Sequence, residues 1–501
     1  MVKTIAEINQ KIAAGNVCVV TAEEMSDIVD DIGAEKAAKE VDVVTTGTFG
    51  AMCSSGVFFN FGHSETPIKI TKMFMNDVEA YAGVAAVDAY LGATQFSEKE
   101  GLKYGGAHVI EDLIAGKEVT ISAYSYGTDC YPKKELTTTV TLNDLNQAIM
   151  LNPRNAYQRY DAATNGSKKI LHTYMGELLP DFKNVTYSGA GILSPISNDP
   201  NYRTIGAGTK IFLGGAQGMI VGEGTQCSTG GGYATLMTTG NLKHMKKEYL
   251  NAASFNGYGI SLYLGLGIPI PILDADMAKS TAVRDADISV GIKDYSIGRR
   301  DRPVLRTATY EELKSGSIEL NGKTVPTSPL SVFKTARKVA EELKNWIAKG
   351  TFTLSEPVLP LPAGQSTKPM KETNKIPLVK DILGDTRLVS VEKNQTVVDA
   401  AKIMRQNERN HLPVVSDKKL AGIITSWDIS KAVSENHLGT IEACMTKNVI
   451  TCSLNEPADV AAKRMAEYHI SAMPVIDENR NVIGIITSEH ISKLFTRGKY
   501  E

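Results

Sequence analysis

The chain has 501 residues, which is long for one hydrophobic core, because single cores stop growing at roughly 250 to 300 residues. Its 54 basic and 56 acidic side chains give a formal net charge of −2, so we expect neither nucleic acid nor an anionic membrane as a partner. The first 40 residues lack a signal-peptide stretch, and the most apolar later segment, 260–273, is too short to span a bilayer. These features predict a cytoplasmic protein of two or more domains that acts on small metabolites.

The cysteine content narrows the chemistry further. Six cysteines in 501 residues are too few for a disulfide scaffold, and no C-x-x-C pair is present. No metal site built from neighbouring cysteines is therefore expected. In a reducing compartment, a thiol in an unusual setting points to catalysis.

The N-terminal region alternates helix and strand signals. Ile5, Ile8 and Ile12 recur at helical spacing, which predicts an amphipathic helix. After a short apolar run, the segment Thr21–Glu24 has the spacing of a capping box that starts a second helix. We therefore expect the α/β class, with a large mixed α/β domain over residues 1–354.

Cys53 lies in a run of small, turn-forming residues, T-T-G-T-F-G-A-M-C-S-S-G at 45–56. A strand predicted over 41–46 leads into this run. Glycines on both sides let the backbone turn tightly and bring amide N–H groups toward the sulfur. A cysteine that only fills a core usually sits in an apolar run, so Cys53 is predicted to carry chemistry.

A second cysteine, Cys130, follows a strand predicted over 119–124 in the run Y-G-T-D-C-Y-P-K-K. Lys133 and Lys134 would lower the thiol pKa from its usual value of about 8.5, whereas Asp129 works in the other direction. Because α/β proteins place their sites where strands end, the two cysteine loops could meet at one sheet edge.

The other cysteines have weaker signals. Cys18, Cys444 and Cys452 lie in strand-like surroundings and are predicted to be buried apolar residues. Cys227 stands among glycines and threonines and stays open as a less favoured nucleophile.

Residues 188–240 are unusually rich in glycine. Glycine at this density weakens helices and strands, so it suggests backbone that closely approaches other backbone or a ligand. The segment is not a dinucleotide fingerprint, because Gly222-x-Gly224 is followed by Cys227 where a third glycine is required, and it has no G-K-[ST] of a P-loop. We interpret it as a segment that lines the site.

The large domain is predicted to close with an amphipathic helix over 331–349. Residues 355–376 contain four prolines among polar residues, so no helix or strand is expected to continue there. This segment is predicted to be a semi-rigid linker.

Beyond the linker the chain repeats itself at an offset of 61 residues, growing to 62 after one insertion. A helix pattern A-A-x-x-M, a strand pattern x-x-P-V and a strand ending G-I-I-T-S each occur twice, in the same order. We place the first repeat at 377–438 and the second at 439–501, and expect them to pack as a pseudo-twofold pair.

Over residues 377–497 these motifs resemble a tandem CBS module, an α+β pair. The resemblance implies that Thr425 and Asp428, from the family motif G-h-h-T-x-x-D, hold an adenosyl ligand. In the second repeat Thr487 is present, but His490 replaces the acidic residue, which favours one good site over two. The full set of adenosyl-ligand residues expected from the resemblance is Thr425, Asp428, His411, Pro413 and Thr487. A pair that binds nothing and only dimerises is the alternative.

The large domain closely resembles the archaeal homocysteine-biosynthesis family. The resemblance rests on the Cys53 run at 45–56, on Y-G-T-D-C-Y-P at 126–132 and on G-T-K-I-F-L-G-G-A-Q-G at 208–218. Members are L-aspartate-semialdehyde sulfurtransferases, and a form with a C-terminal CBS pair occurs in methanogens. The resemblance implies that sulfide-derived sulfur is placed on the aldehyde carbon and that a two-electron reduction yields homocysteine. A ferredoxin-like protein is the implied electron donor.

The resemblance also assigns roles to residues. The two functional cysteines of the family fall on Cys130, which we expect to carry a persulfide, and on Cys53, its partner thiol, although the order could be reversed. A second thiol would release the outer sulfur and leave a disulfide that must be reduced. Candidate ligands of the substrate carboxylate are Gly208, Gly214, Gly215, Gly218, Arg299 and Arg300.

No tightly bound cofactor or metal is expected. The CBS pair is expected to bind S-adenosylmethionine or a related compound, possibly ATP or AMP, and to hold a homodimer together. Two other functions stay open: a non-catalytic, adenosyl-sensing scaffold for a redox partner, and a thiol-dependent oxidoreductase that uses a nicotinamide in the glycine-rich segment.

Overall fold

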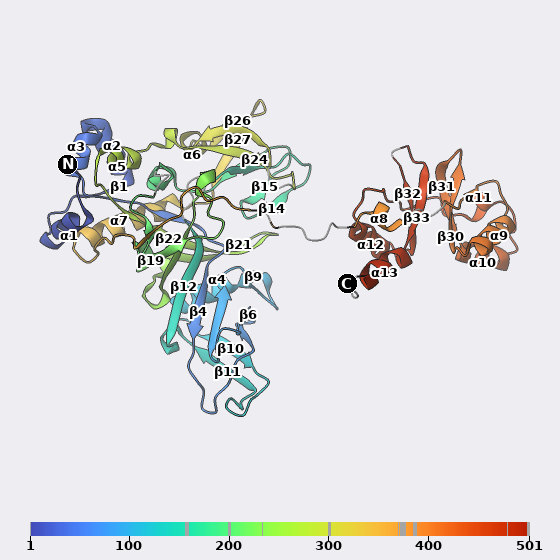
Figure 1. The fold of residues 1–501 in the computed structure, drawn as a ribbon, viewed down its shortest axis with the longest axis horizontal. Coiled ribbons are helices and arrows are strands. Elements are labelled where there is room, and N and C mark those ends of the chain that lie inside the picture. The colour runs from blue at the N-terminus through green and yellow to red at the C-terminus, as the bar shows by residue number, and fades with distance from the viewer. Residues whose placement is uncertain are drawn as a thin grey trace. The chain divides into compact units, whose positions relative to one another are not determined.

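The computed structural model describes residues 2–155, 160–198, 202–232, 234–298, 302–368, 370, 377–383, 388–477 and 479–497. The chain divides into two compact units, residues 1–368 and 369–501, and both mix helices with sheets (Figure 1). The predicted α/β class is thus confirmed for the large domain. No helix in the described ranges is long and apolar enough to cross a membrane.

The helices of the first unit begin where the sequence signals place them. Thr4 and Glu7 form a capping box at the start of the first helix, whose buried side chains are Ile5, Ile8 and Ile12. The box predicted over Thr21–Glu24 is also present. The helices are α1 (Ile5–Ala14), α2 (Ala22–Ile32), α3 (Ala34–Glu40), α4 (Gly106–Ile114), α5 (Ala275–Thr281), α6 (Tyr310–Lys314) and α7 (Phe333–Ala348).

A nine-stranded sheet forms the centre of the first unit. Its strand order is β21-β22-β18-β19-β20-β12-β4-β7, and β3 pairs with β22 beside this path. The strands are β3 (Thr48–Ala51), β4 (Gly56–Asn60), β7 (Asp88–Gly92), β12 (Gln147–Asn155), β18 (Lys210–Leu213), β19 (Ala216–Glu223), β20 (Leu236–Asn241), β21 (Leu250–Phe255) and β22 (Gly259–Gly267).

Burial largely alternates along β4, β7, β12, β19 and β20, so this part of the sheet has two distinct faces. Side chains such as Val57, Met150, Ile220 and Leu262 point into the main hydrophobic core. We call this the inner face and the opposite one the outer face.

A six-stranded sheet packs into the same core through residues such as Met73, Met75 and Ile121. Its order is β11-β10-β5-β6-β8-β9. The strands are β5 (Lys72–Met75), β6 (Val78–Ala80), β8 (Phe96–Ser97), β9 (Gly101–Gly105), β10 (Val119–Tyr124) and β11 (Glu135–Val140). The bounds of β10 match the strand predicted before Cys130.

The remaining strands of the first unit form smaller sheets. A three-stranded sheet contains β1 (Val19–Thr21), β2 (Val43–Thr45) and β23 (Pro269–Pro271). A second six-stranded sheet has the order β25-β24-β13-β16-β27-β26, and β14 pairs with β15. Their bounds are β13 (Ala162–Thr164), β14 (Leu171–Thr173), β15 (Gly176–Leu178), β16 (Val185–Tyr187), β24 (Ser289–Asp294), β25 (Val304–Thr309), β26 (Ser317–Leu320) and β27 (Lys323–Pro329).

The first part of the expected linker is bound to the large domain, and it contains a short strand that the prolines had argued against. β28 (Leu359–Pro360) pairs with β17 (Gly206–Ala207). The Ser355 hydroxyl donates to the Gly208 carbonyl at 2.8 Å. Pro360 is tolerated because β28 is a two-residue edge strand that has a single partner.

The second unit contains two similar α/β repeats. In the first, β29 (Val391–Glu392), β30 (His411–Ser416) and β31 (Lys419–Thr425) form a sheet, and in the second β32 (Ala472–Ile476) pairs with β33 (Val482–Thr487). The helices are α8 (Val379–Leu383), α9 (Val397–Asn407), α10 (Ser426–Ser434), α11 (Ile441–Cys444), α12 (Ala458–Glu467) and α13 (Ser488–Arg497).

Candidate functional site

Cys53 lies in the tight turn that joins β3 to β4. The Met52 N–H donates to the Leu262 carbonyl at 2.7 Å, which continues the pairing of β3 with β22 into the turn. The Ser55 N–H closes the turn onto the Met52 carbonyl at 3.0 Å. The Cys53 sulfur, half-buried, lies 3.1 Å from the Oγ of Ser261, a fully buried residue of β22. The backbone of two strands therefore fixes the position of this thiol.

Two tyrosines, Tyr258 and Tyr263, lie near Cys53. Burial, and the proximity of the Cys53 sulfur, raise the pKa of both Tyr258 and Tyr263. The Tyr258 ring lies 6.2 Å from the ring of Tyr174, whose hydroxyl is 2.8 Å from that of Tyr295. Tyr258 and Tyr263 therefore stay protonated at neutral pH and supply hydroxyl groups without a negative charge that would repel a thiolate.

Cys130 is presented very differently. It is exposed, in the loop between β10 and β11. Thr128 and Tyr131 exchange backbone hydrogen bonds of 3.0 and 3.1 Å across it, and the Thr128 hydroxyl is 3.6 Å from the Cys130 sulfur. The Lys134 side chain passes beside Gly127 in the same loop. The loop therefore offers its thiol to solvent.

The two cysteine loops belong to different sheets and do not meet at one edge, contrary to expectation. The Cys53 turn is at the start of β4, whereas Tyr131 stacks at 5.6 Å on His63, which follows the end of β4. The seven residues of extended chain from Ser55 to Phe61 span roughly 20 Å. Strands β10 and β11 accordingly lie at the far end of this unit from β22 (Figure 1). A disulfide needs Cα atoms within about 7 Å, so these two cysteines cannot bridge in this arrangement.

The four glycines expected to bind substrate lie close against other parts of the chain. Gly214 and Gly215 form the turn between β18 and β19 with φ of 60° and 88°. A Cβ at Gly208 would lie 3.1 Å from Val358, and one at Gly218 would lie 2.8 Å from Leu213. Backbone geometry and packing account for glycine at these four positions. Their binding to the substrate carboxylate stays a prediction.

Arg299 and Arg300 lie outside the described residues. The same basic run continues to Arg302, whose guanidinium carbon lies 4.2 Å above the Tyr295 ring. Its buried Nε has no hydrogen-bond partner among the described residues. Arg302 therefore places a positive charge on the tyrosine cluster that begins beside Cys53.

The other four cysteines have surroundings unlike those of Cys53 and Cys130. Cys18 is exposed, so its predicted burial is wrong: it comes just before β1, where its N–H is bonded to Asp42 at 3.0 Å. Cys444 is half-buried in α11 rather than in a strand. Cys227 and Cys452 are each 3% exposed, and burial raises the pKa of Cys452 to about 12. Cys227 contributes to the main core, which argues against a nucleophile.

Three of the residues expected at the adenosyl site lie together in the first CBS repeat. Asp428 accepts hydrogen bonds from the Thr425 N–H at 2.8 Å and hydroxyl at 2.7 Å, forming the capping box of α10. His411 is the cross-strand partner of Thr425. Burial lowers the pKa of His411, and the nearby Asp428 carboxylate only partly opposes this effect. Pro413 lies two residues further along β30.

The second repeat builds the same helix start with different chemistry. His490 Nδ1 takes the place of the carboxylate, 3.2 Å from the Thr487 N–H. The two repeats touch through His411 Nε2 and the Ser471 hydroxyl at 2.9 Å. An imidazole carries no negative charge, so it cannot replace the carboxylate of Asp428, as the sequence comparison of the repeats indicated.

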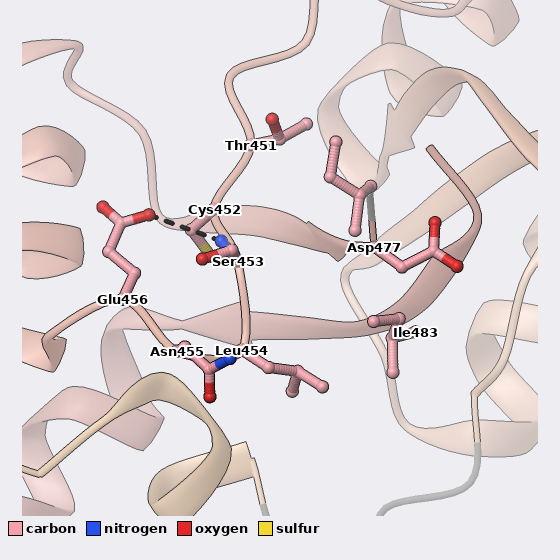
Figure 2. A pocket seen from close by; sticks show the side chains of 9 residues that line it. Thr451, Cys452, Ser453, Leu454, Asn455, Glu456, Asp477 and Ile483 are labelled. Atoms are coloured by element: carbon pink, nitrogen blue, oxygen red, sulfur yellow. Dashed lines mark hydrogen bonds between the residues drawn. The ribbon is translucent and has the colours of Figure 1, made fainter. Parts of the chain in front are cut away.

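A cavity of about 610 Å³ opens in the second repeat. Figure 2 shows the run from Thr451 to Glu456 along one side, with Asp477 and Ile483 on the other. The Ser453 N–H donates to Glu456 at 3.3 Å. None of the five residues expected to bind the adenosyl ligand lines it. Within the described ranges, no three His, Cys, Asp or Glu side chains gather as metal ligands.

Sequence reasoning missed Ser261 and the tyrosines beside Cys53. A signal was present in the run G-I-S-L-Y-L-G-L-G at 259–267, where apolar residues alternate with others in period two. Its leucines fill the core, which leaves Ser261 and Tyr263 on the other face.

Comparison with known proteins agrees with this architecture. The profile of a family described as homocysteine biosynthesis enzyme, sulfur-incorporation, matches residues 17–354, and CBS domain profiles match 379–435 and 439–497. An L-aspartate semialdehyde sulfurtransferase from Methanosarcina acetivorans is 62% identical over 99% of both chains, and one from Methanocaldococcus jannaschii is 53% identical over 99% of both.

Among solved structures, a CBS domain pair in complex with 5′-methylthioadenosine and S-adenosyl-L-methionine is 49% identical, with a TM-score of 0.24. The match covers 25% of this chain and 100% of that one. The family profile covers more than half of the chain, and the two relatives cover nearly all of it. The chain therefore belongs to the family of sulfur-incorporating homocysteine biosynthesis enzymes, here followed by a pair of CBS domains.

Proposed function

We propose that this protein transfers sulfide-derived sulfur to L-aspartate 4-semialdehyde through a cysteine persulfide and so produces L-homocysteine. The full-length relatives that carry the sulfurtransferase name support the substrate. The observation that carries the proposal is the setting of Cys53, a half-buried thiol 3.1 Å from the Ser261 hydroxyl and beside neutral tyrosines. A hydroxyl at this distance can stabilise a thiolate by donating a hydrogen bond.

The proposed cycle uses both cysteines. Sulfide opens a disulfide of Cys53 and Cys130, which places a persulfide on Cys130 and a thiol on Cys53. The outer sulfur adds to the aldehyde carbon. The Cys53 thiolate then attacks the Cys130 sulfur, which restores the disulfide and leaves the outer sulfur on the substrate.

Because sulfide itself reopens the disulfide, this cycle needs no separate reduction of it, unlike the expectation from the sequence, and electrons are needed only after the transfer. Loss of water from the product gives a carbon–sulfur double bond, which takes two electrons and two protons to become the thiol of homocysteine. A ferredoxin-like protein is the proposed donor. For the substrate carboxylate we propose Arg299, Arg300 and the stacked Arg302, because a guanidinium pairs with a carboxylate through two parallel hydrogen bonds; Gly208, Gly214, Gly215 and Gly218 stay weaker candidates.

For the CBS pair we propose that Thr425 and Asp428, with His411 and Pro413, hold S-adenosylmethionine or a related adenosyl compound. Asp428 is already oriented by the capping box, so its second oxygen is available to hydroxyl groups of a ribose. Thr487 would serve a weaker second site, and the pair would also join two chains. Homocysteine is one methylation from methionine, so such a ligand would report the output of the pathway.

Intact-mass measurement tests the catalytic proposal. After exposure to sulfide under oxidising conditions, the full chain is expected to gain one sulfur atom, and this gain should be absent in Cys130→Ser. Homocysteine should form when aspartate semialdehyde and a chemical reductant are added. An unmodified mass with no product would favour the non-catalytic scaffold, and titratable nicotinamide binding would favour the oxidoreductase.

Calorimetric titration with S-adenosylmethionine tests the CBS proposal. Asp428→Asn keeps a helix cap but removes the charge, and should weaken binding about tenfold or more, the scale of one charged hydrogen bond. His490→Asn is the matched control at the corresponding position of the second repeat and should change the first site little. Equal losses in both variants would contradict the assignment.

A further inference from the structure

The outer face of the nine-stranded sheet carries exposed apolar side chains. Ile149 on β12 and Met219 and Val221 on β19 are each 44–48% exposed, although they lie in the middle of the sheet. Phe58 and Tyr90 continue the same face, with their rings 4.7 Å apart. Five adjacent strands at about 4.8 Å spacing and roughly 20 Å length give nearly 500 Å² per chain. Two such faces together approach the total of about 1,000 Å² that a specific interface needs.

Cys53 lies at one end of the strands that form this face, and the Cys130 loop lies beyond their other end, on the sheet that packs against the inner face. At one end the Tyr90 hydroxyl covers Gly56, three residues after Cys53, where an added Cβ would meet it at 2.2 Å. At the other end a polar row of Asp88, Asn60 and Asn146, with hydrogen bonds of 2.7 and 2.9 Å, closes the apolar area. Beyond this row His63 stacks on Tyr131, the neighbour of Cys130.

We propose that a second copy of this chain packs on the outer face, with a twofold axis perpendicular to β4, and that Cys130 of one copy acts on Cys53 of the other. Such an axis reverses the direction of the strands across the interface, so the Cys130 end of each copy lies over the Cys53 end of its partner. The dimer then has two equivalent sites, each formed by Cys53 of one copy and Cys130 of the other. Each site is incomplete without the second chain.

The inference rests on the proposed two-cysteine function and resolves its geometric difficulty. Within one chain about 20 Å of sheet separates the thiols. In the dimer, the Cys53 thiolate of one copy attacks the Cys130 sulfur of the other. The bond between that sulfur and the outer sulfur breaks, its electron pair leaves with the outer sulfur on the substrate, and a disulfide between the chains forms. The number of electrons in the site does not change.

Complementation between two inactive variants tests the proposal. Cys53→Ser and Cys130→Ser chains with different tags are co-expressed at full length, and dimers carrying both tags are purified. One of the two sites then holds both thiols, so about half of the wild-type activity is expected per dimer, while each variant alone stays inactive. A mixed dimer without activity, beside an active wild type, would overturn the proposal. An inactive wild type would instead contradict the proposed function.

Isotope mixing gives a second, independent result on the unaltered chain. Equal amounts of ¹⁴N and ¹⁵N protein are exchanged into mixed dimers, oxidised and digested. Disulfide-linked peptides that join Cys53 of one label to Cys130 of the other are expected. Peptides in which both halves always share one label would mean that the loop moves within its own chain.

Interface variants locate the contact. Ile149→Glu places a charge in the middle of the outer face and should reduce the inter-chain disulfide at least tenfold. Val304→Glu is the control, because Val304 is a similarly exposed β-branched residue, 52% exposed, on a strand of another sheet. An equal effect of both variants, or an active enzyme that sediments as a monomer, would contradict this interface.

Discussion

Cys53 and Cys130 illustrate two ways of presenting a thiol. The Cys53 turn is fixed by the pairing of two strands and by the Asn152 side chain, which donates to Ser55 at 2.6 Å in the core. The Cys130 loop is closed mainly by its own backbone hydrogen bonds and is exposed. In the proposed cycle, this difference makes Cys53 the fixed partner thiol and Cys130 the thiol that is delivered to it. The following predictions test this contrast.

Loss of either thiol should have the largest effect. Cys53→Ser and Cys130→Ser are each expected to lower homocysteine formation by about 1,000-fold or more, because a hydroxyl is a far weaker nucleophile at neutral pH. The intact masses of the two variants should differ. Cys53→Ser should still accept a sulfur from a persulfide donor, whereas Cys130→Ser should not. A persulfide retained only on Cys53 would reverse the assigned order.

Matched glycine substitutions compare the stability of the two surroundings. Gly47, which precedes the Cys53 strand, has the Ala336 carbonyl of α7 only 2.0 Å from where a Cβ would lie. Gly47→Ala should therefore destabilise the large domain by about 3 kcal/mol. Gly127→Ala, in the Cys130 loop at φ 78°, meets the flexible Lys134 side chain at 3.1 Å and the Pro132 carbonyl at an ordinary 3.4 Å, and should cost about 1 kcal/mol.

Urea denaturation with full-length protein measures both values. Equal costs would mean that the Cys130 loop is held as tightly as the Cys53 frame, and would remove the basis for the contrast.

Removing the Ser261 hydroxyl beside Cys53 should lower kcat more than removing the Thr128 hydroxyl beside Cys130. Removal of the Ser261 hydroxyl, 3.1 Å from Cys53 in a buried position, should lower kcat about tenfold, which corresponds to about 1.4 kcal/mol. Thr128→Ala near the exposed Cys130 should change it about twofold or less, because water can replace that hydroxyl. Ser261→Thr, which keeps a hydroxyl, should recover part of the loss; a Thr128 effect as large as that of Ser261 would contradict the model of a solvent-exposed carrier.

Accessibility gives the smallest expected difference. Iodoacetamide should modify Cys130 about fivefold faster than Cys53 in the reduced protein, because Cys53 is half-buried. Peptide mass spectrometry, with denatured protein as the reference, gives both rates. If Cys53 reacted faster, its thiolate character would outweigh its burial, and Cys53 would become the better candidate for the persulfide carrier.

Local signals in the sequence determined much of the fold. The isoleucine spacing of α1, the capping box at Thr21 and the closing helix α7 all appear where predicted, because hydrogen bonds between near neighbours define them. The bounds of β10 were also correct. The repeat that marks the CBS pair is a property of the sequence itself, and the family profiles confirm it.

Strand pairing between distant segments decided the rest. The pairing of β3 with β22 brings Ser261 to Cys53 across 208 residues, and no spacing in the sequence encodes that register. The pairing of β10 with β5 and β11 places the Cys130 loop on a different sheet. Cys18 is exposed before the short strand β1, which pairs with β2, despite its apolar neighbours.

By itself, then, the sequence predicted which residues carry chemistry, namely two cysteines in turn-rich loops and the Thr425–Asp428 pair, because the local composition around them is reactive or polar. Only the tertiary structure decided how they are combined. The structure gives Cys53 a hydroxyl partner and a fixed place. It also separates Cys130 from Cys53 by the length of a strand. Because the two ends of one strand cannot meet, a disulfide between these cysteines requires a second chain or a moving loop.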